Sequence, residues 1–135
     1  MKTLLPNGWV RPKGYANGVS TGQQVPGGRF VFVAGMIGWD AQGVFQSDDF
    51  LGQTRQALQN IVEVLQVDGA QPEHIVRMTW YITNKREYLS VGADLGKAFR
   101  AIVGNFNIAM TAVEVSALME DRAKVEIEAT AFVPE

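Results

Sequence analysis

Two stretches of the chain repeat apolar residues at three- and four-residue spacing, and each lies between stretches of strand character. The first stripe is formed by Leu51, Thr54, Leu58, Ile61, Val62 and Leu65, and the second by Tyr88, Val91, Leu95, Ala98, Phe99 and Ile102. This spacing predicts two amphipathic helices. Capping candidates at 47–49 begin the first helix and Asp68-Gly69 ends it, whereas Asn84, with Glu87 three residues later, begins the second and Gly104 ends it.

Strands are predicted at about 19–24, 29–35, 75–83, 109–118 and 124–133, following a turn-rich arm over residues 1–18. We expect the last two strands to form a hairpin joined by residues 119–122. Along 75–83, Val76, Met78, Trp80 and Ile82 are expected to share one face. The element order is ββαβαββ, an α/β (α+β) arrangement. Right-handed strand–helix–strand crossovers then place both helices on one face of a mixed sheet.

The sheet face opposite the predicted helices is left without a packing partner in this arrangement. Along the last strand Val125 and Ile127 alternate with Glu126 and Glu128, so one side is apolar and the other charged. Strand 29–35, in contrast, has no polar residue after Arg29, and we expect both of its faces to be covered. The second sheet face is therefore either solvated or buried against another chain.

Composition narrows the classes of function. The 135 residues suit one domain, 1–135, and the formal net charge of −2 opposes a nucleic-acid partner. With no cysteine, no paired histidines and no nucleotide-binding glycine loop, we expect no metal and no cofactor. The one histidine, His74, is expected in a helix–strand connection, outside any catalytic triad. No segment suits a signal peptide or a membrane span, so a soluble, cytoplasmic protein is expected.

Several motifs along the chain occur in the order found in one known family. They are Lys13-Gly14-Tyr15-Ala16-Asn17-Gly18, Ala34-Gly35-Met36-Ile37, the helix from Gln53 to Asn60, and the segments 108–118 and 123–131. This combination resembles the reactive intermediate deaminase family, formerly YjgF, also called L-PSP endoribonuclease-like. The resemblance spans essentially the whole chain. It implies a chorismate-mutase-like fold, a homotrimer, and small-molecule clefts between subunits.

The resemblance also implies roles for individual residues. Glu126 matches the carboxylate that positions water for attack on an imine carbon, which suits general-base chemistry. Tyr15 matches a cleft-lining aromatic residue of the arm, and Gly35 a glycine whose backbone approaches the substrate. From the residues alone, the favoured interpretation of Glu126 and Glu128 is a solvated or salt-bridged strand face, with Lys124 or Arg122 as partner.

The departures from the family pattern all remove polar groups. Met110 stands where the family has the arginine that anchors a substrate carboxylate, and Ala112 replaces a small polar residue two positions later. Ala34 and Met36 replace a serine and a glutamine. Methionine cannot imitate the bidentate guanidinium fork. A larger or less acidic ligand is therefore expected, with Arg11 or Lys13 as a relocated cation and Trp39 or Trp80 either extending the cleft or packing in the core.

Two functions fit this pattern. The first is a divergent deaminase that hydrolyses a reactive imine or enamine other than 2-aminoacrylate, favoured by the presence of Glu126. The second is a non-catalytic trimeric protein that binds a small molecule on the same fold, favoured by Met110. An endoribonuclease activity is opposed by the sequence pI of about 5.4 and by the single histidine.

Overall fold

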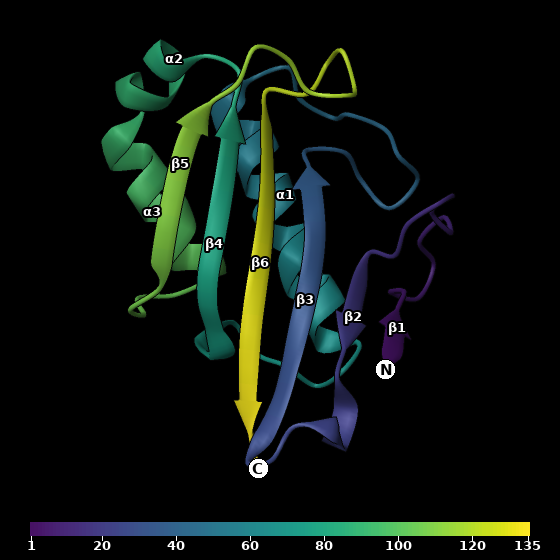
Figure 1. Ribbon diagram of the computed structural model, residues 1–135. Helices are drawn as coiled ribbons and strands as arrows, with labels where there is room; N and C mark the ends of the chain where they lie inside the picture. Colours follow the sequence, from purple (N-terminus) through teal and green to yellow (C-terminus); the bar gives the residue numbers. More distant parts are fainter.

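One six-stranded mixed sheet organises the computed structural model, which describes residues 1–135 (Figure 1). The strands are β1 (Lys2–Leu4), β2 (Gly18–Ser20), β3 (Gly28–Ile37), β4 (Ile75–Ile82), β5 (Ala109–Glu114) and β6 (Val125–Pro134). The helices are α1 (Phe50–Gln66), α2 (Lys85–Ser90) and α3 (Gly92–Ile102), with short 3-10 turns η1 (Gly22–Gln24) and η2 (Pro72–His74). No helix is long and apolar enough to cross a membrane.

The predicted helix starts are confirmed by their caps. The Asp49 side chain accepts a hydrogen bond from the Gly52 N–H, and the Asn84 side chain accepts from the N–H groups of Arg86 and Glu87. Each cap satisfies backbone donors that have no partner within the helix. Gly69, with φ of 70°, takes the left-handed conformation just after α1.

The expected C-terminal hairpin is wrong. The strand order is β1-β2-β3-β6-β4-β5, so β6 lies between β3 and β4 and does not pair with β5. β5 instead pairs parallel to β4, as a right-handed crossover through α3 requires, and forms one edge of the sheet. β6 is antiparallel to both of its neighbours. Its alternating buried residues, Val125, Ile127, Ala129 and Ala131, complete the core at the centre of the sheet.

Three local expectations also need correction. The second helix is divided at Val91, whose φ of −109° and ψ of 17° end α2 before Gly92 begins α3. A register shift between Ile75 and Arg77 sends Ile75 into the core and leaves Val76 45% exposed. The strand expected at 19–24 ends at Ser20, and the arm contributes the edge strand β1.

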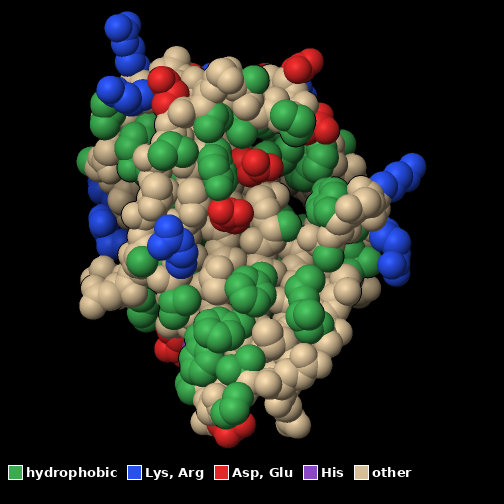
Figure 2. All heavy atoms as spheres, in the orientation of Figure 1, with side chains coloured by type: hydrophobic (Ala, Val, Ile, Leu, Met, Phe, Trp, Pro, Cys, Tyr) green, Lys and Arg blue, Asp and Glu red, His purple; other side chains and the backbone are tan.

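Helices cover only one face of the sheet. α1 and α3 lie behind the strands in Figure 1, and the buried apolar cluster lies between them and the sheet. On the opposite face, which we call the open face, hydrophobic side chains surround acidic ones near the middle of the molecule (Figure 2). Phe32 of β3 is 45% exposed there, so within a single chain the second face of β3 is uncovered.

Candidate functional site

Two carboxylates stand side by side on the open face. Glu126 and Glu128 are two residues apart on β6, so both point away from the helices. The register pairs Glu126 with Tyr81 of β4 and Glu128 with Thr79. The Tyr81 hydroxyl donates a hydrogen bond of 3.0 Å to Glu128 Oε1, and this bond raises the pKa of the Tyr81 phenol.

The Glu126 carboxylate packs against the backbone of Gly35. A Cβ atom at Gly35 would lie 2.8 Å from Glu126 Cδ and 3.0 Å from its Oε1. β3 shifts register between Val33 and Met36, at this point of the strand. The expected irregularity and close approach at Gly35 are therefore confirmed. The absence of a side chain makes room for the carboxylate.

Glu126 has no cationic partner. Burial, and then repulsion by Glu128, raise the pKa of the Glu126 carboxyl. The two basic residues that would have made this a paired strand face are engaged elsewhere. Lys124 Nζ lies 3.0 Å from Glu87 Oε2, and Arg122 Nη2 lies 2.7 Å from Asp48 Oδ1. The structure thus favours a half-buried, unpaired carboxylate over a salt-bridged one.

A hollow of about 390 Å³ lies on the open face beside Glu128, and Glu126 is not among the residues that line it. Its lining includes Ala34, Glu128, Thr79, Arg77 and Phe32. Arg77 is exposed and makes no salt bridge. Sequence reasoning missed Arg77 and Tyr81. The alternation along β4 could have placed both on the face of Glu126, had the pairing of β4 with β6 been known.

Met110 and Ala112 lie on the other side of the sheet. In the parallel register they pair with Met78 and Trp80, whose side chains are buried beneath the helices. Met110 is 46% exposed and lines a second hollow, of about 630 Å³, between β5 and the helices α2 and α3. The structure therefore separates Met110 from Glu126 by the thickness of the sheet.

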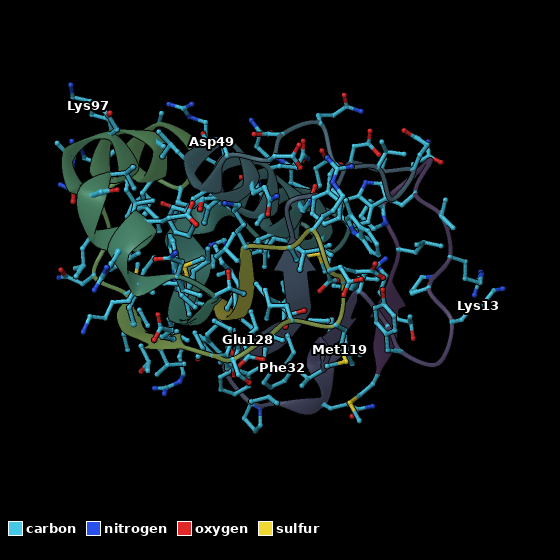
Figure 3. All side chains as sticks on the ribbon, turned by 90° about the horizontal axis from the view of Figure 1, so that it is seen from above. Lys13, Phe32, Asp49, Lys97, Met119 and Glu128 are labelled. Atoms are coloured by element: carbon cyan, nitrogen blue, oxygen red, sulfur yellow. The ribbon has the colours of Figure 1, made fainter.

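The other residues that the sequence predicts at the site do not lie together in the structure. Tyr15 is exposed on the arm, next to Ala16, which lines the open-face hollow. The side chain of Met36 is only 4% exposed and belongs to the core. Arg11 and Lys13 are exposed on the arm, and Lys13 points outward at the edge of the molecule, away from Glu128 (Figure 3). Neither cation lines the hollow that contains Met110.

The two tryptophans proposed as cleft extensions differ. Trp80 is 4% exposed and belongs to the core, yet it also lines the second hollow. Trp39 packs against Phe45, with ring centroids 6.0 Å apart. His74 lies in η2, where its Nδ1 accepts a hydrogen bond from the Gln71 N–H, as expected for a residue of a helix–strand connection.

A six-stranded mixed sheet with helices on only one of its faces is an α+β fold. Comparison with known proteins identifies the family to which this chain belongs. The model of the family described as Endoribonuclease L-PSP matches residues 15–133. The chain therefore belongs to that family, which includes proteins named reactive intermediate deaminases.

Individual relatives agree with this placement. A RutC family protein of Pyrococcus horikoshii is 32% identical over 111 residues, which cover 82% of this chain and 84% of the relative. A 2-iminobutanoate/2-iminopropanoate deaminase of Salmonella typhimurium is 30% identical over 81% of this chain and 84% of its own length. The crystal structure of the YjgF gene product from E. coli covers 98% of both chains, with a TM-score of 0.80 and 27% identity.

Proposed function

We propose that this protein is a divergent imine or enamine deaminase, which hydrolyses a reactive C=N intermediate other than 2-aminoacrylate. The observation that carries the proposal is the Glu126 carboxylate. It is half-buried, has no hydrogen-bonded or cationic partner, packs against the Gly35 backbone and has a raised pKa. Carboxyl groups in such surroundings are frequent acid–base catalysts. The relative named 2-iminobutanoate/2-iminopropanoate deaminase supports the class of reaction.

The reaction needs one group that first accepts and then returns a proton. A water molecule on Glu126 adds its oxygen to the imine carbon while its proton passes to the carboxylate. The carboxyl returns this proton to the imine nitrogen, which gives the carbinolamine. It then passes the hydroxyl proton of the carbinolamine to the amino group as the C–N bond breaks, so that ammonia leaves and the carbonyl product forms. A carboxyl with a raised pKa is a better proton carrier for this cycle near neutral pH than an ordinary glutamate.

The complete site lies between two chains of a homotrimer in this proposal. Glu126, Gly35 and Ala34 belong to the open face, whereas Met110 and Ala112 face the helix side. Residues on opposite faces of one sheet reach a common ligand only when a second chain supplies one of the two sets. The uncovered open face, with Phe32 exposed, offers a surface for such an assembly.

A measurement of imine hydrolysis tests this function. Imino acids generated by an amino-acid oxidase are supplied to the protein, and ammonia or carbonyl product is followed above the spontaneous rate. Glu126→Gln should lower kcat by about 100-fold or more, as expected for loss of a general base. Glu120→Gln, an exposed loop position, is the matched control and should have no effect.

A specific observation favours the second candidate, a non-catalytic binding protein. Met110 and Ala112 offer no charged anchor at the positions where the family pattern has polar groups. This alternative predicts equal, near-spontaneous rates for the unmodified protein and Glu126→Gln across short, branched and aromatic imino acids. Such a result would contradict the deaminase proposal.

A further inference from the structure

The hollow between β5 and the helices α2 and α3 is large, mostly apolar and free of acidic residues. Its volume is about 630 Å³, within the range of small-molecule sites. Its apolar lining includes Trp80, Tyr88, Leu89, Leu95, Phe99 and Phe106. No aspartate or glutamate lines it, and its one charged side chain is Arg100.

Two glycines shape this hollow. A Cβ atom at Gly96 would lie 3.1 Å from Arg100 Nη1 and 3.9 Å from its Cζ, so the guanidinium of Arg100 rests on the bare backbone one turn earlier in α3. Gly104 has φ of 112°, and a Cβ atom there would overlap the Phe106 ring. The Phe106 ring therefore folds back over the end of α3, against the hollow.

Arg100 has no protein partner. It takes part in none of the four salt bridges and in none of the side-chain hydrogen bonds of the chain. Trp80, which also lines the hollow, has a buried Nε1–H without a hydrogen-bond partner. The exposed, unpaired guanidinium of Arg100 is the donor that a ligand in the hollow can reach.

We propose that this hollow binds a monocarboxylate with an aromatic or bulky apolar body, and that Arg100 holds the carboxylate. The anchoring cation thus lies on α3, about one helix turn from Gly96, while Met110 forms part of the apolar wall. A guanidinium binds a carboxylate through paired hydrogen bonds. Taken with the proposed function, on which this extension rests, the substrates are 2-imino acids with large apolar side chains.

Calorimetric titration with three probes tests the binding site. The probes are 3-phenylpropanoate, propanoate and 3-phenylpropanamide, which separate the ring from the charge. We expect 3-phenylpropanoate to bind best, and at least about 10-fold more tightly than either of the other two. No detectable binding of 3-phenylpropanoate would overturn the proposal.

Two matched variants identify the anchor. Arg100→Met removes the charge but keeps an unbranched side chain, and should weaken 3-phenylpropanoate binding about 10- to 100-fold while leaving the amide unaffected. Lys97→Met removes a cation from the same helix; Lys97 points into solvent (Figure 3) and does not line the hollow, so binding should be unchanged. Equal losses for acid and amide, or no loss at all, would show that Arg100 is not the anchor.

The chemistry is tested separately through Glu126→Gln. Arg100-dependent binding of 3-phenylpropanoate without any imine hydrolysis would refute the deaminase function and leave this site standing. Hydrolysis that depends on Glu126 but is indifferent to Arg100→Met, with short imino acids preferred, would refute this site and leave the deaminase function standing.

Discussion

Glu126 combines features that are unfavourable for folding with those that the proposed chemistry needs. Its carboxylate is half-buried beside Gly35, close to the like charge of Glu128, and has no cation to offset either cost. Lys124 and Arg122, its near neighbours in sequence, are held by Glu87 and Asp48. Groups placed in this way cost stability in their charged form, and they recur at catalytic sites.

The raised pKa of Glu126 predicts that its effect on the free energy of unfolding depends on pH. Because the folded chain binds this proton more tightly than the unfolded chain, the Glu126 contribution to the free energy of unfolding falls as pH rises through its folded pKa. Glu126→Gln should therefore raise the free energy of unfolding at pH 7. This gain should shrink as pH falls through the raised folded pKa, and it should be gone below about 4, where the carboxyl is protonated in both the folded and the unfolded chain. Urea unfolding at several pH values measures this difference. A gain that is constant with pH would contradict the account.

Met110→Arg tests whether only the carboxylate anchor of the family pattern is missing. Met110 is half-exposed at the edge of its hollow, so the longer cation fits without burial. We expect kcat/KM for short imino acids to rise about 10-fold, the value of one charged hydrogen bond. The gain should be partial, because Arg100 already lines the same hollow and the two guanidinium groups repel. It should disappear in the double variant with Glu126→Gln; persistence there would show that Glu126 does not activate water.

At the scale of elements, the position of β6 decides the geometry of both hollows. Inserted between β3 and β4, this strand places Glu126 and Glu128 at the centre of the open face. β5, displaced to the edge, leaves Met110 beside α3. The helix break at Val91 then separates α2 from α3, and both helices contribute walls to the larger hollow.

Two substitutions in helix α3 should change stability in opposite directions, and only one of them should change ligand binding. Gly96→Ala should raise the free energy of unfolding by roughly 0.5–1 kcal/mol, since alanine is the better helix former. It should nevertheless weaken 3-phenylpropanoate binding several-fold, because the new methyl crowds Arg100 Nη1, 3.1 Å away. Ala101→Gly, at an exposed position of the same helix, should lower stability by a similar amount and leave binding unchanged. Calorimetry and urea unfolding together distinguish the two; binding that follows helix stability in both variants would contradict the role of Gly96.

At the scale of the whole molecule, the open face predicts assembly. Helices cover one side of the sheet, and the other presents exposed Phe32 together with half-buried aromatic side chains from β3 and β6 (Figure 2). A small chain with such a face is expected to bury it against copies of itself.

We therefore expect a homotrimer in solution, measured by sedimentation equilibrium. Phe32→Glu should shift the population toward monomer at micromolar concentration, because it places a charge on the face that the proposed trimer would bury. Gln59→Glu adds the same charge on the exposed surface of α1 and should leave the trimer intact. A stable monomer for the unmodified chain would overturn both the trimer and a cleft shared between chains.

The sequence by itself determined most of the elements, because their signals are local. Apolar spacing located α1 and the second helical stretch. The capping candidates at 47–49 and Asn84 indicated where these helices start, and alternation along β6 separated the carboxylates from the core. Only the tertiary structure decided how these elements meet. The pairing of β6 with β3 and β4, the separation of Met110 from Glu126 and the approach of Arg100 to that hollow all join residues distant in sequence. Such contacts depend on which arrangement of the elements buries all of their apolar faces at once. A local sequence pattern does not contain this information.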